Sequence, residues 1–322
     1  MKLLVTTDFH LGLTRSANFT ADSSQAREAE SRKTLSSILS TPHDEAICVG
    51  DFFDKFSNSE GLLLESLHYA EHFKFILAGN HDLSNRHSAK SSLEVVNRVL
   101  GNVVFEPLVS SGEEVAYHFV PHCLTQDLFE HELERLAPEE GKRNLLFLHC
   151  NYNIPFEQDY ASLNLSAQRA EQLLEHFDHI FVGHVHTPSD HFEDRLHIVG
   201  SHFPTAFDNL TDKRHLVYYS ATNQVTSICH WKADQMAYVG PSDTAPDGRQ
   251  FYDFTTPCDP KLAVKLFKQG AFGIRLPCAV PQRQALKVDA FERLPDAIAR
   301  ELREKDTDLF HLWTELSHAD VD

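Results

Sequence analysis

One pattern recurs five times in the first two-thirds of the sequence: a short apolar or β-branched run, followed at once by Asp, Asn, Gly or His. The runs lie at residues 3–7, 46–49, 73–78, 144–148 and 179–182. Between them, segments such as 62–70 and 170–177 carry apolar residues at helical spacing. Strands that alternate with helices predict a layered α/β fold. Because such folds gather their strand-end loops at one edge, we expect the polar clusters to share one pocket.

Length and composition are those of a globular chain. At 322 residues, the chain is long enough for one large core and a small accessory domain, since a domain takes roughly 150 residues. No apolar run approaches the ~18 residues that a membrane-spanning helix needs, so we expect a cytoplasmic protein that does not enter a membrane. The six cysteines include no C-x-x-C pair, which argues against a disulfide framework or a thiolate zinc site.

The formal net charge is −18, which is unusual for a protein that binds nucleic acid by itself. Affinity for a phosphate backbone normally comes from clustered Lys and Arg. Divalent cations bound by carboxylates would offset part of this charge, and a partner subunit could supply most of the grip on DNA.

The sequence after residue 196 indicates further strands and a domain boundary. Alternating segments at 197–199, 216–220 and 225–231 predict strands that complete a second sheet. Residues 240–248 are dense in turn formers, so we place a linker at 241–248 between a domain at 1–240 and a smaller domain at 249–322. The small domain is predicted to be α+β, with a helix at 261–268, a strand at 273–276 and a helical pattern from Pro295 onward.

The polar clusters have the composition of a two-metal site. They are Asp8-Phe9-His10, Gly50-Asp51-Phe52-Phe53-Asp54, Gly79-Asn80-His81-Asp82, His149, and Gly183-His184-Val185-His186. Carboxylate, imidazole and amide oxygen ligands together suit a pair of divalent ions. Two ions roughly 3.5 to 4 Å apart can neutralise phosphoryl oxygens and activate water, as hydrolysis of a phosphodiester requires.

Spacing within the clusters supports a shared pocket. Glycines precede Asp51, Asn80 and His184, and they would let the backbone turn sharply as it leaves a strand. His184 and His186 lie two residues apart, so in extended chain they would project to the same side and could serve neighbouring ions.

These motifs resemble the calcineurin-like metallophosphoesterases, and their details favour the SbcD-like branch, whose members are nuclease subunits in double-strand-break repair. Residues 8–12 resemble the D-x-H-L-G opening of that branch, residues 50–54 its G-D-x-F-D, and residues 79–82 its G-N-H-D. Residues 197–204 resemble its strand-G-S/T-x-x-P segment. The resemblance covers roughly residues 1–230. Viral recombination endonuclease subunits share this layout, so a phage-encoded subunit fits as well.

The resemblance implies a fold, a cofactor and residue roles. The fold would be a four-layer αββα sandwich followed by a cap domain. The cofactor would be two divalent ions, usually Mn²⁺, with Mg²⁺ as the alternative. Asp8, His10 and His186 would hold one ion, and Asn80, His149 and His184 the other. Asp51 would bridge the two ions, and His81 would contact the phosphate and donate a proton to the leaving oxygen. Asp54 and Asp82 would orient these groups.

The implied function is that of a metal-dependent DNA exo- or endonuclease, as the subunit of an SbcCD-like complex for DNA repair or recombination. Its partners would be DNA, a coiled-coil ATPase of the SbcC type and, in a homodimer, a second copy of the chain. Two alternatives stay open: a phosphodiesterase or phosphatase for small molecules, which the acidic balance favours, and a non-catalytic scaffold for the ATPase.

Some residues outside the motifs have both a structural and a functional interpretation. Arg86, His87 and His202 either contact substrate or are ordinary structural residues. Lys261, Lys265 and Lys268 form a basic stripe on the predicted helix, which either grips DNA or is a solvated face. Near the C-terminus, an apolar stripe either packs on the small domain or docks a partner. That stripe consists of Leu309, Trp313 and Leu316.

Overall fold

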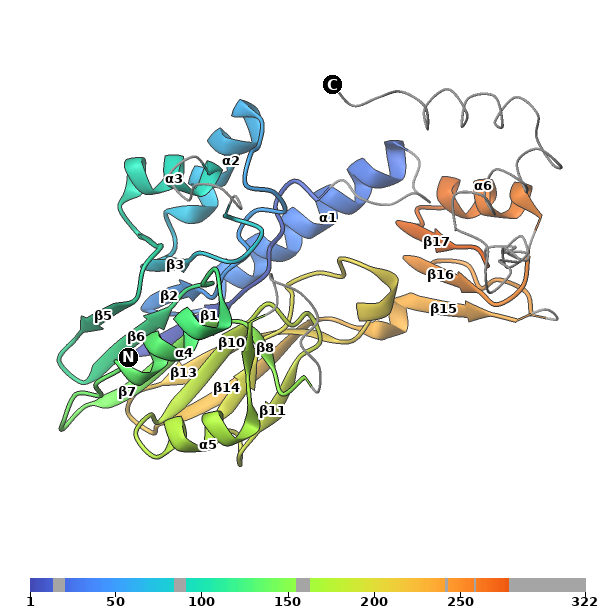
Figure 1. Ribbon diagram of the computed structural model, residues 1–322. Helices are drawn as coiled ribbons and strands as arrows, with labels where there is room; N and C mark the ends of the chain where they lie inside the picture. Colours follow the sequence, from blue (N-terminus) through green and yellow to red (C-terminus); the bar gives the residue numbers. More distant parts are fainter. Residues whose placement is uncertain (14–20, 84–90, 155–162, 241–242, 258, 278–322) are drawn as a thin grey trace, which may run out of the picture. The chain divides into compact units, whose positions relative to one another are not determined.

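The computed structural model describes residues 1–13, 21–83, 91–154, 163–240, 243–257 and 259–277 (Figure 1). The chain divides into two units, residues 1–276 and 277–322. All of the second unit except Pro277 lies outside the described residues, so the elements below belong to the first unit.

Two six-stranded sheets form the centre of the first unit. In the first sheet the order is β14 (Gln224–Trp231), β13 (Lys213–Tyr219), β1 (Lys2–Thr6), β2 (Glu45–Cys48), β3 (Phe75–Leu77) and β4 (Val103–Val104). In the second sheet the order is β11 (Ser189–His191), β12 (Leu196–Ile198), β10 (His179–Gly183), β7 (Arg143–His149), β6 (Val115–Val120) and β5 (Leu108–Ser111).

The central strands of each sheet are parallel, which places their carboxyl ends at a common edge. Strands β1 to β4 are parallel, with Thr6 opposite Cys48. Strands β6, β7, β10 and β12 are also parallel, with His149 opposite Gly183. Antiparallel strands occupy the flanks: β13 and β14 in the first sheet, and β5 and β11 in the second. The loops that follow the parallel strands therefore start side by side.

The first unit has four layers, helices, sheet, sheet and helices, with a buried hydrophobic cluster at each of the three interfaces between them. Alternate residues of one strand point to opposite faces, so Leu3 and Val5 enter the cluster between the sheets, where they join Phe147 and Phe181 of the second sheet. Leu4 enters the cluster beneath the helices of the first sheet. Those helices are α1 (Ala21–Leu39), α2 (Glu60–Ala70) and α3 (Ser92–Leu100), while α4 (Gln126–Glu134) and α5 (Ala167–Leu174) cover the second sheet.

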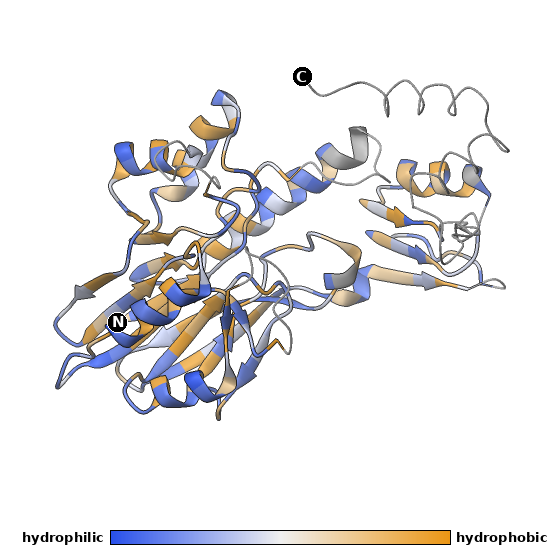
Figure 2. Cartoon of the chain, viewed as in Figure 1, coloured by the Kyte–Doolittle hydropathy of each residue, from blue (hydrophilic) through white to orange (hydrophobic). Residues whose placement is uncertain are grey.

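The predicted α/β sandwich is therefore confirmed, and hydrophobic residues concentrate in the strands of both sheets (Figure 2). The helices that cover the sheets begin at side-chain caps of the kind that satisfies free amides in the first turn. The hydroxyls of Ser59, Ser91, Thr125 and Ser166 accept from the backbone amides of Leu62, Glu94, Leu128 and Arg169, respectively.

One strand assignment from the sequence is wrong. Segments 216–220 and 225–231 do form strands, but β13 and β14 join the first sheet beside β1 and not the second sheet. Only β12, from segment 197–199, belongs to the second sheet. Sheet membership depends on which strand edge is free, and local alternation carries no information on that.

A small parallel sheet follows the sandwich. It consists of β15 (Met236–Val239), β16 (Phe251–Phe254) and β17 (Gly273–Arg275), packed with α6 (Pro260–Lys268). Strand β15 precedes the predicted linker and pairs with β16 beyond it, so the sheet spans that segment. The predicted boundary at 241–248 stays a prediction. The remaining elements are β8 (Asn151–Tyr152), β9 (Asn164–Leu165), and 3-10 turns at Phe207–Asn209 and Ala233–Gln235.

Within the described residues, no helix is both long and apolar enough to cross a membrane. Of the cysteines that the structure describes, Cys48, Cys123 and Cys150 are buried free thiols and Cys229 is an exposed one.

Candidate metal centre

The structure brings together all seven residues predicted as metal ligands. Each stands at or just beyond the carboxyl end of a parallel strand: Asp8 and His10 after β1, Asp51 after β2, Asn80 after β3, His149 at the end of β7, and His184 and His186 after β10. They lie in two groups with one residue between them.

The first group consists of Asp8, His10 and His186. The Nε2 atoms of His10 and His186 are 3.0 Å apart. Oδ1 of Asp8 lies 3.6 Å from Nε2 of His186 and 3.8 Å from Nε2 of His10. Three potential ligand atoms therefore converge on one point.

The second group consists of Asn80, His149 and His184. Oδ1 of Asn80 lies 3.2 Å from Nε2 of His149 and 2.9 Å from Nδ1 of His184. Nδ1 of His149 donates to the carbonyl oxygen of Val49 at 2.8 Å. In the neutral ring this donation leaves the lone pair of His149 on Nε2, toward the centre.

Asp51 lies between the two groups. Its Oδ2 is 3.7 Å from Nε2 of His10 in the first group. Its Oδ1 is 3.4 Å from Nε2 of His149 in the second group. One carboxylate thus presents an oxygen to each group, which is the geometry of a bridging ligand.

The donor atoms fit divalent cations. Oδ1 of Asp8 is fully buried and has no hydrogen-bond partner within the described part of the chain. When His149 is neutral, as a metal ligand must be, the lone pair on its Nε2 faces Oδ1 of Asn80 at 3.2 Å. A buried arrangement of acceptors without protons between them is unfavourable unless a positive charge lies among them. Oxygen and imidazole donors are those that Mn²⁺, Mg²⁺ and Zn²⁺ accept.

The titration of the cluster reflects its negative potential. Burial alone would lower the pKa of His10, but Asp54 and Asp8 raise it to about 10. Burial likewise opposes the charge on His149, and Asp51 raises the pKa of that ring to about 9. Burial alone would raise the pKa of Asp8 and Asp51, yet the neighbouring imidazoles hold both pKa values well below the ordinary value. The carboxylates therefore stay ionised and attract cations.

His81 stands at the edge of the centre, with a side chain 32% exposed. Its Nδ1 donates to the backbone oxygen of Asp54 at 2.8 Å, which leaves Nε2 as the nitrogen available to a substrate. The rings of His81 and His10 meet edge to face, with centroids 4.8 Å apart. Oδ1 of Asp54 lies 3.5 Å from Nδ1 of His10 and 4.0 Å from Nδ1 of His81, so Asp54 contacts both rings.

Asp82 ties two of the motif loops together. Its Oδ2 accepts from the amides of Gly79, at 3.0 Å, and Phe52, at 3.2 Å, and its Oδ1 accepts from the amide of Phe53 at 2.9 Å. Burial, followed by repulsion from Asp51, raises the pKa of Asp82 to about 7, although the three amides lower it. Asp82 therefore sets the position of the loops that carry Asp51 and Asn80.

The backbone around the centre is strained. Asp8, His10, Asp51 and His184 have φ values of 54°, 46°, 48° and 83°, in the left-handed region that L residues seldom adopt. Gly50, at φ +107°, has His149 so close that a Cβ would lie 2.0 Å from Nδ1 of that ring. Gly79 is needed for a different reason from the one the sequence suggested: a Cβ there would lie 2.1 Å from Oδ1 of Asp51.

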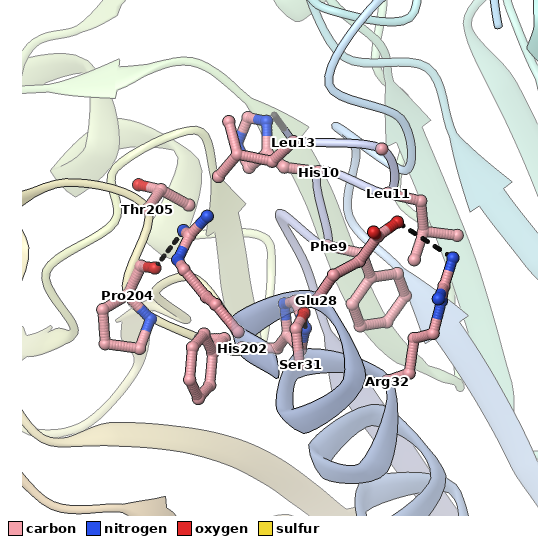
Figure 3. A pocket seen from close by; sticks show the side chains of 13 residues that line it. Phe9, His10, Leu11, Leu13, Glu28, Ser31, Arg32, His202, Pro204 and Thr205 are labelled. Carbon is pink, nitrogen blue, oxygen red and sulfur yellow. Dashed lines mark hydrogen bonds and ion pairs between the residues drawn. The ribbon is translucent and has the colours of Figure 1, made fainter. Parts of the chain in front are cut away.

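His202 has almost no surface with which to contact a substrate. It is 1% exposed, and its two ring nitrogens contact the hydroxyl of Ser31 at 2.8 Å and the backbone oxygen of Asp8 at 3.3 Å. Figure 3 shows His202 beside Ser31 on α1. Arg86 and His87, the other predicted substrate contacts, lie outside the described residues.

Three residues near the centre carry no sequence signal. His122 is half-buried, with its ring centroid 6.5 Å from that of His149, and burial lowers its pKa to about 3. Thr205 and Asn209 contact the ring of His186. None of the three stands in a metal-ligand motif or directly after one of the predicted strands, so sequence spacing did not indicate them.

Comparison with known protein families identifies the class. The model of the calcineurin-like phosphoesterase family matches residues 1–188, which hold the seven predicted ligands. The chain therefore belongs to the calcineurin-like phosphoesterase family, whose members are metal-dependent phosphoester hydrolases. A comparison with curated protein sequences gave no match.

Solved structures of low sequence identity are also similar. A protein from Staphylococcus aureus assigned as a 5′-nucleotidase has 16% identity and a TM-score of 0.40, and the match covers 71% of this chain but only 53% of that one. An archaeal phosphodiesterase has 12% identity, with 71% and 99% coverage and a TM-score of 0.37. The calcineurin-like phosphoesterase YfkN from Bacillus subtilis has 12% identity, with 71% and 88% coverage and a TM-score of 0.36. At these scores they say nothing about substrate.

Proposed function

We propose that this protein is a metal-dependent nuclease that hydrolyses phosphodiester bonds in DNA, acting as the subunit of an SbcCD-like complex. The observation that carries the hydrolytic part is the placement of Asp51, whose two oxygens face two separate ligand groups. That geometry suits two ions on one phosphate.

The ligand groups divide as the motif resemblance implies. Asp8, His10 and His186 would hold one ion, Asn80, His149 and His184 the other, and Asp51 would contact both. When bound, two divalent ions neutralise charge on the phosphoryl oxygens and lower the pKa of water to provide a nucleophile. Mn²⁺ is the metal we propose, with Mg²⁺ as the alternative.

The chain's own residues would donate the proton to the leaving group and hold the proton donor in position. His81 donates its Nδ1 proton to the Asp54 carbonyl, so its Nε2 can carry a second proton toward the leaving oxygen of the substrate. The carboxylate of Asp54 lies beside the ring, with Oδ1 4.0 Å from Nδ1 of His81. The backbone amide of His81 donates to Asp51, which fixes the distance between the proton donor and the ligand groups.

The DNA part rests on the match of residues 8–12, 50–54 and 79–82 to the motifs of the SbcD-like branch. The net charge of −18 implies that a partner supplies much of the affinity for DNA. We therefore include an SbcC-like ATPase and a second copy of the chain as proposed partners, and a cytoplasmic location. Lys261, Lys265 and Lys268 are exposed on α6, opposite the buried Leu266, and are free to contact DNA. The apolar stripe at 309–316 lies outside the described residues.

The test offers the protein two substrates. Purified chain with Mn²⁺ is incubated with duplex DNA and, separately, with bis-nitrophenyl phosphate, and His81→Ala and Asp51→Ala are run beside it. We expect cleavage of both substrates by the wild type and loss of DNA cleavage in both variants. Hydrolysis of the small ester alone, even with the ATPase added, would rule out the nuclease. If neither substrate is hydrolysed, the remaining alternative is a non-catalytic scaffold for the ATPase.

A small-molecule phosphodiesterase is the second candidate, and the acidic charge is the observation that favours it. An anionic protein repels a polyanion at long range but tolerates a substrate with one phosphate. Salt distinguishes the two: for a nuclease with phosphate contacts, DNA cleavage falls steeply as salt rises, whereas turnover of a small ester changes little.

A further inference from the structure

Among contacts between described residues, His186 is the one proposed ligand whose ring nitrogen lies against a hydroxyl group. Its Nε2 faces the first ligand group, 3.0 Å from Nε2 of His10. Its Nδ1 points the other way, and lies 2.7 Å from Oγ1 of Thr205 and 3.0 Å from Nδ2 of Asn209. Thr205 borders the crevice beside His10 (Figure 3).

The tautomer of His186 determines which of these contacts are hydrogen bonds. A neutral imidazole carries one proton, and a metal ligand must keep its lone pair on the coordinating nitrogen. If Nε2 of His186 binds an ion, the proton has to reside on Nδ1. Nδ1 then needs an acceptor, and the Asn209 amide nitrogen is itself a donor. The hydroxyl of Thr205 is the acceptor within reach.

Asn209 holds that hydroxyl in place. Oδ1 of Asn209 accepts from the backbone amides of Thr205 and Ala206, both at 3.2 Å. This assigns the amide nitrogen to the other side, where it lies 2.6 Å from Oγ1 of Thr205. Asn209 is 7% exposed, so its contacts replace water and fix the rotamer of Thr205.

The backbone of His186 is fixed as well. Its carbonyl oxygen accepts from Nζ of the fully buried Lys213 at 2.8 Å and from the amide of Ser201 at 3.2 Å. With the main chain anchored, the orientation and tautomer of the ring depend on what Nδ1 contacts.

We infer that Thr205, held by Asn209, is a positioning residue that keeps the proton of His186 on Nδ1 and so reserves Nε2 for the ion of the first group. This inference rests on the proposed metal-dependent function. It concerns only one of the two ions. In the second group, the Val49 carbonyl oxygen accepts the Nδ1 proton of His149 and so keeps Nε2 of that ring free for the other ion.

The test measures metal binding directly. Mn²⁺ is titrated calorimetrically into metal-free wild type, Thr205→Val and Thr205→Ser. Valine keeps the shape but leaves Nδ1 facing only the donor of Asn209, which favours the tautomer with the proton on Nε2. We expect two ions in the wild type, a 10- to 100-fold weaker affinity for one ion in Thr205→Val, and near wild-type binding of both in Thr205→Ser.

A second variant provides rescue. In Thr205→Val/Asn209→Asp, a carboxylate can accept the Nδ1 proton directly, so the affinity for the weakened ion should return. Should Thr205→Val fail to fold, Asn209→Asp alone decides, because it should bind one ion at least as tightly as the wild type, and weaker binding would overturn the inference. Equal binding of both ions by folded Thr205→Val would also overturn it. A wild type that binds no pair of ions would instead overturn the proposed function.

Discussion

The backbone amide of His81 donates a hydrogen bond of 2.9 Å to Oδ1 of Asp51. The proposed proton donor is therefore tied to the carboxylate that both ligand groups share. Any change that moves Asp51 moves His81 with it, so substitutions at the two positions have to be distinguished by what each removes.

Asp51→Asn removes charge and preserves shape. The Asn oxygen can still accept from the His81 amide, but a neutral amide binds two cations poorly. We expect loss of at least one bound ion and a fall in turnover of more than about 100-fold, measured by elemental analysis and initial rates. Asp127→Asn, an exposed change on α4, is the control. Two ions per chain in Asp51→Asn would contradict the bridging role.

His81→Asn removes the proton donor and leaves the ligands. On DNA, whose leaving alkoxide needs a proton, we expect a fall in rate of about 10² to 10⁴. On bis-nitrophenyl phosphate the leaving nitrophenolate needs none, so the fall should be less than about tenfold. Metal content should not change. Equal losses on the two substrates would show that His81 acts by some means other than proton donation.

Asp82→Asn tests the tie between the two motif loops. The amide nitrogen of Asn would replace one acceptor of the Gly79, Phe52 and Phe53 amides, which leaves a buried donor without a partner. We expect the free energy of unfolding to fall by about 1–3 kcal/mol, measured by chemical denaturation without metal. A variant as stable as the wild type would mean that the loops hold without this carboxylate.

His215 predicts how stability depends on pH, away from the metal centre. Burial lowers its pKa from 6.5 to about 4, so between these values the unfolded chain binds a proton that the folded chain does not. Stability therefore falls as the pH falls from about 6.5 to about 4. In His215→Gln, the loss of unfolding free energy between pH 7.5 and 4.5 should be smaller than in the wild type, by on the order of 1–3 kcal/mol.

The control for that measurement is Leu64→Gln, because Leu64 is exposed on α2 and the change removes no titratable group. It should leave the slope of stability against pH unchanged. Burial also lowers the pKa values of His179 and His230 to about 4. Both residues are present in the two variants, so part of the dependence of stability on pH should remain in each. The same slope in His215→Gln as in the wild type would refute the prediction.

The sequence predicted the strands that carry the candidate ligands because each strand is a short apolar run with an abrupt polar end. Strands β1, β2, β7 and β10 lie within a residue or two of their predicted ranges. Helix α1 was not predicted, since its buried apolar residues, Leu35, Ile38 and Leu39, all lie in its second half. The sheet that β13 and β14 join was misassigned, because pairing depends on distant strands.

The candidate ligands could be named from the motifs, and their role stays a prediction, but the contacts that orient their side chains could not be named. The Val49 carbonyl that fixes His149 lies 100 residues away in sequence, and Thr205 lies 19 residues from His186. Partners at such separations follow from the tertiary fold alone. The burial of His202 was equally invisible, because a histidine next to a motif has the same local sequence whether it faces solvent or α1.

Positive φ at Asp8, His10, Asp51 and His184 costs on the order of 1 kcal/mol or more at each position. The packing of the two sheets offsets this strain. Glycine would relieve it at any of the four, since it populates this region freely. A descendant released from selection for turnover should therefore drift toward glycine there, most readily at His10 and His184, because Asp8 and Asp51 also accept from the backbone amides of His184 and His81. Such replacements in a homologous sequence would mark an inactive lineage while its fold remained intact.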